Sequence, residues 1–320
     1  MNLTSPADHS LRVRLKASLL GVVGSFVLFA AYLAVPPLGI FSGVLAPFPA
    51  TYNRLVYGRV PSLIILLGAT TALTALFGIV AGVLYLGMCT MIGFLMPELL
   101  LRGFSGSRAL LWTTAANLFI FAAGIIAYGT VSGVNLQQVI SVEISGSLKQ
   151  ALALYEKGGV TGEELDIVKQ SMVTAADLLQ RLYPALATIM FVAIAGCNLV
   201  LVKKALAKTA ITLAISDFKM FRNPELLVWL LILAGFALLL PVSLITTPAL
   251  NILLIITMMY FFQGMAVVSS FISMYSVPAF VRIFLYVMLI IQPYLLAFVA
   301  GVGLFDLWVD FRTPKTQENL

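Results

Sequence analysis

The sequence predicts an all-α protein: a polytopic transmembrane helical bundle of about nine spans, eight being possible, with an extracytoplasmic amphipathic helical hairpin. Hydrophobic residue types make up 61% of the chain and charged types only 10%, and the mean hydropathy is +1.05. A soluble domain is about half apolar and about a quarter charged. So much apolar surface cannot be buried in a water-soluble globule, which excludes soluble enzymes and nucleic-acid-binding domains.

Nine apolar runs are candidate spans, because a spanning helix needs roughly 20 apolar residues. The first run follows a polar segment with three basic residues but offers no small-residue cleavage site, so it is interpreted as a retained span. The nine runs cover residues 17–35, 38–53, 61–77, 80–97, 110–130, 183–203, 225–245, 249–274 and 279–304.

Two stretches leave alternatives open. The run 38–53 is short and contains Pro47 and Pro49, so it could be re-entrant instead of crossing the membrane. Residues 62–96 carry no charge, and one helix of that length, rising about 1.5 Å per residue, is too long for about 30 Å of hydrocarbon. The sequence therefore predicts two helices with a break near Gly78–Gly82, and one continuous helix is the alternative.

The distribution of basic residues predicts the orientation, because cytoplasmic loops are enriched in Lys and Arg. With nine spans in a bacterial inner membrane and a cytoplasmic N-terminus, residues 131–182 and the C-terminus lie outside. Neither alternative number of spans places as many basic residues on the inner side. Thirteen of the 19 then lie there: Arg12, Arg14, Lys16, Arg54, Arg59, Arg102, Arg108, Lys203, Lys204, Lys208, Lys219, Arg222 and Arg282.

The polar stretch 131–182 is predicted to form the outer hairpin. Apolar residues recur every three or four positions over 136–155, and Gly158–Gly159 favour a stop before a second amphipathic helix. This second helix is expected to continue through Pro184 into the next span. The predicted regions are an N-terminal membrane region with five spans (1–130), the hairpin (131–182), a C-terminal membrane region with four spans (183–304) and a polar tail (305–320).

A further amphipathic helix is predicted over 203–222, lying in the cytoplasmic interface. Lys204, Lys208 and Lys219 form one polar stripe, and apolar residues line another side. Lysines at this depth favour contact with anionic headgroups, and a partner protein could use the same basic face.

Little side-chain chemistry is available within the spans. The single histidine is His9 in the polar N-terminal segment, and Cys89 and Cys197 lie in apolar runs. No Asp or Glu lies in the middle of a predicted span, which argues against an ion-coupled pump, and no P-loop is present. The expectation is therefore no enzyme, no cofactor, no metal site and no nucleic-acid partner.

Amides also occur at depth in the predicted spans, and four of them are the candidate binding residues: Asn117, Asn198, Gln263 and Gln292. Such amides either bind a small polar solute in a bundle cavity or hydrogen-bond between helices. Gln263 and Gln292 are both expected to face the bundle interior, because an amide in hydrocarbon lacks hydrogen-bond partners.

Four segments in the second half of the chain carry a family resemblance. They are 182–186, Asn198 with Lys203 and Lys204, 218–224 followed by Trp229, and 259–268. Together they resemble the YybS-like family of uncharacterised bacterial inner-membrane proteins. That family is distantly similar to the substrate-binding components of energy-coupling-factor transporters, which are helical bundles that work with separate ATPase subunits. No individual binding residue is carried over by the resemblance.

Two functions follow as hypotheses. The first is a solute-binding or transport component of the inner membrane that works with partner membrane or ATPase subunits. The alternative is a non-transport membrane scaffold or regulatory protein. A large polar-lined cavity between the fifth, eighth and ninth predicted spans would favour the first, and a solidly packed bundle with the amides paired to one another would favour the second.

Overall fold

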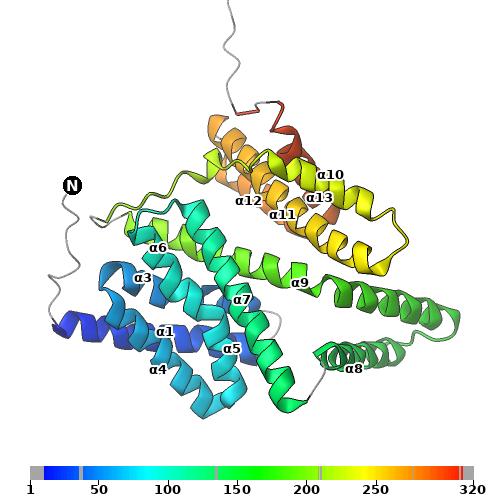
Figure 1. Ribbon diagram of the computed structural model, residues 1–320, viewed down its shortest axis with the longest axis horizontal. Coiled ribbons are helices and arrows are strands. Elements are labelled where there is room, and N and C mark those ends of the chain that lie inside the picture. Colours follow the sequence, from blue (N-terminus) through cyan, green and yellow to red (C-terminus); the bar gives the residue numbers. More distant parts are fainter. Residues whose placement is uncertain are drawn as a thin grey trace, which may run out of the picture. The chain divides into compact units, whose positions relative to one another are not determined.

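The computed structural model describes residues 11–312 except 36–38, 134–135, 208, 210, 276 and 310, so His9 and Lys208 lie outside the described residues. The described residues form helices and no strand, which confirms the all-α fold class. A π-helix, η2 (Met91–Leu95), and a 3₁₀ turn, η3 (Phe218–Met220), interrupt the α-helices. The α-helices (Figure 1) are α1 (Leu11–Ala34), α2 (Gly39–Leu45), α3 (Phe48–Val56), α4 (Arg59–Phe77), α5 (Ile79–Thr90), α6 (Met96–Leu101), α7 (Gly106–Ser132), α8 (Leu136–Lys157), α9 (Glu163–Leu206), α10 (Leu226–Ala237), α11 (Ser243–Met274), α12 (Ala279–Ile291) and α13 (Pro293–Phe305).

Fewer helices than predicted have the length and composition of a membrane span. The described chain contains 6 such helices, or 7 if α12 and α13, which are bent by 105°, count as one span. The predicted run 38–53 forms two short helices, and the run 225–245 contains α10 of only 12 residues. The six are Leu11–Ala34, Arg59–Phe77, Ile79–Leu101, Gly106–Thr130, Glu163–Leu206 and Ser243–Met274.

The contacts group the chain into two compact units. The first unit comprises Met1–Ile140 and Met190–Ile215, and the second comprises Ser141–Ile189 and Ser216–Leu320. The long helix α9 belongs to both, its first part to the second unit and its last part to the first.

The two short helices α2 and α3 lead the chain back along α1. Pro47, which lacks a backbone N–H, precedes α3 and separates it from α2. The Ser25 hydroxyl donates to the carbonyl of Ala46 at 2.6 Å, whereas Gly39 packs against the backbone of Tyr32, further along α1. The segment α2–α3 therefore runs antiparallel to α1, and α3 ends near the level at which α1 begins. The predicted span 38–53 is wrong as one helix, yet these residues still reverse the chain.

A tight turn at Gly78 joins α4 and α5. Gly78 has φ 89° and ψ 168°, a conformation that is essentially restricted to glycine. After the turn, Gly82 packs directly against Thr74, so the two helices form a hairpin (Figure 1). The predicted break near Gly78–Gly82 is confirmed, and the alternative of one continuous helix is wrong.

The remaining helices of the first unit pack around the same core. Gly106 at the start of α7 lies against Leu199 of α9, and the rings of Phe121 and Phe191 meet edge to face with centroids 5.7 Å apart. The two helices therefore run in opposite directions within this unit. Buried side chains of α1, α4, α5, α7 and α9 share one hydrophobic cluster.

Helices α8 and α9 agree with the predicted hairpin elements. Helix α8 ends at Lys157, immediately before Gly158, and α9 continues for 44 residues with Pro184 inside it. Pro184 disrupts the backbone hydrogen bonds of α9, and the side chain of Asn251 from α11 bonds to the helix at this point. The backbone N–H of Ala185 donates to Asn251 Oδ1 at 2.9 Å, and Asn251 Nδ2 donates to the carbonyl of Arg181 at 2.8 Å. One amide side chain thus replaces the hydrogen bond between Ala185 and Arg181.

The predicted interfacial helix 203–222 is wrong. Helix α9 ends at Leu206, residues 211–217 are not helical, and only the short turn η3 follows. Ile211, Leu213 and Ile215 are half-buried and alternate with exposed residues, and they pack against the hydrophobic clusters of the first unit. This period of two is that of extended backbone, in which alternate side chains point to opposite sides.

In the second unit, α11 and α13 pack with their backbones in close contact. Gly264 of α11 lies directly against the backbone of Val299, and Gly303 of α13 lies directly against the carbonyl of Tyr260. A Cβ atom at either glycine would occupy the space of a backbone atom, so the approach of these helices depends on the missing side chains.

We expect Gly303→Ala to destabilise the second unit by about 1–3 kcal/mol, the usual range for overpacking. Gly301→Ala on the same helix is the matched control, because no atom lies within 4 Å of its Cβ position. Thermal unfolding of both variants in detergent measures the difference, and equal melting temperatures would contradict the proposed role of Gly303.

Candidate functional site

The two glutamines predicted to face the interior have different environments. Gln263 is fully buried; its Oε1 accepts from the backbone N–H of Asn223 at 2.9 Å, and its Nε2 donates to Asp306 Oδ2 at 2.9 Å. The interior position is confirmed for Gln263. Gln292 is exposed at the bend between α12 and α13, so the interior prediction is wrong for Gln292. Pro293 starts a new helix at this point, and the preceding residue is extended.

Gln263 belongs to a buried polar network that sequence reasoning missed. Asp306 is buried and forms an ion pair with Arg312, at 2.7 Å between Nη2 and Oδ2. Arg312 Nη1 also donates to the carbonyl of Lys219 at 2.7 Å, and Asn223 Nδ2 donates to the carbonyl of Met259 at 2.8 Å. The network joins α11, the segment 218–224 and the end of α13. The signal in the sequence was a single carboxylate, Asp306, inside the apolar run 302–309.

This network corrects one part of the predicted topology. Lys219 was placed on the cytoplasmic side and the C-terminal segment on the outer side, but Arg312 is hydrogen-bonded to the backbone of Lys219. The two segments therefore lie together. The predicted ninth span, 279–304, is bent at Gln292 and does not cross as one straight helix.

Asn117 and Asn198 are both buried in the first unit. Asn198 Nδ2 donates to the carbonyl of Val44 at 2.8 Å and to that of Ile194 at 2.7 Å. Asn117 Nδ2 donates to the carbonyl of Met88 at 3.5 Å. The Oδ1 atoms of both side chains have no hydrogen-bond partner among the described residues. These amides thus join helices, with one acceptor on each left over.

The three lysines predicted to share a helix face do not share one. Lys204 is exposed in the last turn of α9 in the first unit. Lys219 is half-buried in the second unit, where its Nζ donates to Ser273 Oγ at 2.8 Å. Lys208 lies outside the described residues.

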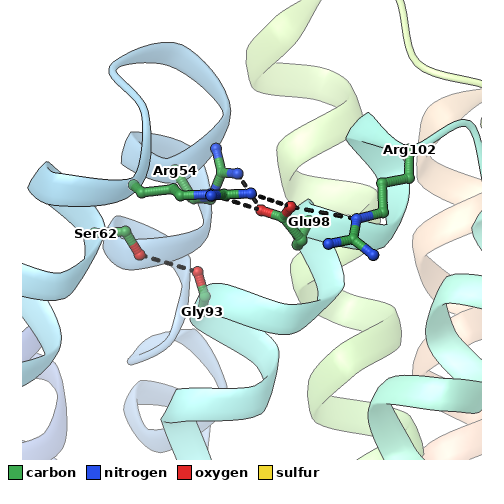
Figure 2. Close-up of polar contacts among 6 residues, drawn as sticks. Arg54, Ser62, Gly93, Glu98 and Arg102 are labelled. Carbon is green, nitrogen blue, oxygen red and sulfur yellow. Dashed lines mark hydrogen bonds and ion pairs between the residues drawn. The ribbon is translucent and has the colours of Figure 1, made fainter.

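The strongest concentration of charge in the first unit surrounds Glu98 of α6. Figure 2 shows Arg54 and Arg102 reaching its carboxylate from opposite sides, each in an ion pair. Arg59 at the start of α4 is a third partner, with 2.7 Å between its Nη2 and Glu98 Oε1. The Arg54 and Glu98 side chains are only 7% and 12% exposed, whereas those of Arg59 and Arg102 are 63% and 65% exposed. One negative charge therefore holds three positive charges, and two of them remain open to the surroundings.

The π-helix η2 positions this cluster. A π-helix leaves carbonyl groups outside the normal i→i+4 pattern, and two of them accept side-chain hydroxyls. Thr51 Oγ1 donates to the carbonyl of Ile92 at 3.1 Å, and Ser62 Oγ donates to that of Gly93 at 3.2 Å (Figure 2). Arg54 lies one turn after Thr51 and Arg59 one turn before Ser62. The two hydroxyl bonds thus bring both arginines to the helix that carries Glu98.

The described basic residues of the first unit all lie at one end of it. Gly21 packs against Ile65 and Gly68 against Val22, so α1 and α4 run in the same direction and begin at the same end. The chain turns back at Gly78 between α4 and α5, so α6 lies at this end. Helix α7 begins here, and α9, which is antiparallel to α7, ends here. We call this region the basic end; it carries Arg12, Arg14, Lys16, Arg54, Arg59, Arg102, Arg108, Lys203 and Lys204.

Glu98→Gln is expected to lower the stability of the protein by roughly 3 kcal/mol or more, because it leaves the buried Arg54 without a counter-charge. Glu225→Gln, an exposed carboxylate at the start of α10, is the control. Thermal unfolding in detergent compares the two variants. The double variant Arg54→Leu/Glu98→Leu should recover part of the loss; equal melting temperatures of Glu98→Gln and wild type would show that the ion pair contributes nothing.

Among the described residues, no three His, Cys, Asp or Glu side chains come together as a metal site. Cys89 is buried and Cys197 half-buried, and both are free thiols. Comparison with known proteins finds no match among curated proteins and none among solved structures. A family described as "Predicted membrane protein (DUF2232)" matches residues 23–307, which is most of the chain, including both the Glu98 cluster and Gln263. The chain therefore belongs to the DUF2232 family of membrane proteins.

Proposed function

We propose that this protein is a multi-pass scaffold or regulatory component of the bacterial inner membrane, without catalytic activity, that holds partner subunits at its basic end. The observation that carries the proposal is the use of the buried amides. Gln263 is bonded through both its oxygen and its nitrogen, and Asn198 uses both of its N–H groups on backbone carbonyls. Amides occupied in this way stabilise helix packing and have little capacity left for a solute.

The basic end supports the second part of the proposal. Basic residues flank the cytoplasmic ends of membrane helices, so this end is assigned to the cytoplasm and the far end of α7 to the outside. Exposed Lys204 and Arg59 then face cytoplasmic partners and acidic surfaces. Helix α8 and the first part of α9 follow α7 and are assigned to the outer side.

A solute-binding or transport component remains the second candidate. The buried Oδ1 atoms of Asn117 and Asn198, which have no partner among the described residues, support it because a buried acceptor without a donor is unfavourable. The resemblance to the YybS-like family, and through it to the substrate-binding components of energy-coupling-factor transporters, points to the same candidate.

Native mass spectrometry of the gently purified full chain distinguishes the two candidates. We expect co-purifying protein subunits whose retention falls in Lys204→Glu but not in Lys149→Glu, an exposed lysine of α8. Gln263→Leu should lower stability by about 1–3 kcal/mol, because Asp306 and the N–H of Asn223 lose a buried partner. It should leave the pattern of bound small molecules unchanged.

Two results would contradict the scaffold proposal. A small polar molecule that co-purifies with wild type and is absent from folded Asn198→Leu would replace the scaffold proposal with solute binding. Subunits retained equally by Lys204→Glu and Lys149→Glu would remove the assigned role of the basic end.

Cysteine labelling in intact cells tests the orientation, in a background in which Cys89 and Cys197 are replaced by Ala. Ser107→Cys at the basic end should react with an impermeant maleimide only after permeabilisation, whereas Gln150→Cys in α8 should react in intact cells. The reverse pattern of labelling would overturn the assigned orientation.

A further inference from the structure

An apolar groove runs between α6 and α7 in the first unit. Its volume is about 520 Å³. Trp112 and Phe119 are exposed along it, so the groove is open to the surroundings of the helices. Two small residues, Ala115 and Ala116, leave the hollow between larger neighbours. The groove is lined by Leu95, Leu99, Phe104, Trp112, Ala115, Ala116 and Phe119.

Two arginines lie at one end of this groove. Arg102 is the residue at which α6 ends, three positions after the groove residue Leu99, and Arg108 lies in the first turn of α7, four positions before the groove residue Trp112. Both side chains are exposed, and both belong to the basic end. Arg102 shares the Glu98 carboxylate with Arg54 and Arg59, so its positive charge is only partly compensated.

The geometry points to a binding site for an anionic glycerophospholipid. The phosphate of the lipid lies between Arg102 and Arg108, and one of its acyl chains occupies the groove beside Ala115 and Ala116. Guanidinium groups bind phosphate oxygens through paired N–H donors. The combination of a basic end and an apolar groove that starts there matches a molecule with a charged head and an apolar chain.

The charge of the lipid headgroup, and not the acyl chain, decides which lipid is retained. The groove holds the acyl chain, which anionic and zwitterionic lipids have in common, so it retains a lipid without distinguishing one headgroup from another. Each basic residue near an anionic headgroup contributes roughly five-fold in binding. The site therefore selects anionic over zwitterionic lipids. It requires no partner subunit, so this inference holds independently of the proposed function.

Native mass spectrometry of the full chain in detergent, with equal amounts of phosphatidylglycerol and phosphatidylcholine, tests the headgroup site. Wild type is expected to retain phosphatidylglycerol in preference, and Arg102→Gln/Arg108→Gln to lower that preference about ten-fold or more. Arg12→Gln/Lys16→Gln, which removes the same charge from α1 at the same end, should change it less than two-fold. Equal preference in the two double variants would overturn the site.

A second pair of variants tests the groove. Ala115→Phe fills it, whereas Ala123→Phe adds the same bulk to an exposed position of α7 outside it. Ala115→Phe should lose most of the bound phosphatidylglycerol at an unchanged melting temperature, and Ala123→Phe should retain it. Equal retention by the two variants would remove the acyl-chain site.

The source of the phosphate is tested with glycerol 3-phosphate as a competitor. We expect it to leave the bound lipid in place, because it lacks the acyl chain. Release of the lipid at millimolar glycerol 3-phosphate would replace the lipid site with a site for a soluble phosphate compound. A co-purifying protein subunit that is present with wild type and absent from Ala115→Phe would replace it with a protein-binding site.

Discussion

Buried polar groups in an apolar environment must find their hydrogen-bond partners within the protein, because lipid offers none. Three places in the described part of the chain meet that requirement with side chains from another segment. Asn251 replaces the hydrogen bond between Ala185 and Arg181 beside Pro184. Thr51 and Ser62 bond the carbonyls of the π-helix. Gln263 is bonded to Asn223 and Asp306.

These bonds also determine where charge is found. The hydroxyl bonds to η2 bring α3 and α4 to α6, and the arginines that meet at Glu98 are a consequence of that packing. In the second unit, the bonds of Gln263 bring Asp306 into the interior, where Arg312 supplies the opposite charge. In both places a buried carboxylate is paired with arginine, which avoids the large cost of an isolated buried charge.

Within each unit, the buried amides are bonded to other groups of the protein, whereas exposed basic side chains are available to other molecules. Gln263 and Asn198, which the sequence offered as solute ligands, are engaged within the protein. Arg59, Arg102 and Lys204 are exposed at the basic end, which also carries an apolar groove. Such a surface is suited to anionic lipids and to acidic partners. This is the reason why the proposed function and the lipid site both involve the periphery of the bundle.

The sequence alone determined the membrane-protein class, the helical fold and a break near Gly78–Gly82, because composition and the length of an uncharged stretch can be read without knowing the packing. It also predicted the interior position of Gln263, since the cost of an unpaired amide in lipid is independent of the fold. It did not predict that Ile211, Leu213 and Ile215 would be extended, because an apolar pattern with several β-branched residues fits either period until the packing surface is known.

Only the tertiary structure decided the positions that depend on distant partners. Gln292 is exposed because Pro293 starts a helix in a new direction, and Asp306 is buried because Gln263 and Arg312 reach it from elsewhere in the chain. The residues that approach Glu98 are likewise separated from it in sequence by up to 44 positions. The physical reason is that an ion pair or hydrogen bond requires atoms within a few ångströms, and which atoms meet at that distance is set by how the helices pack.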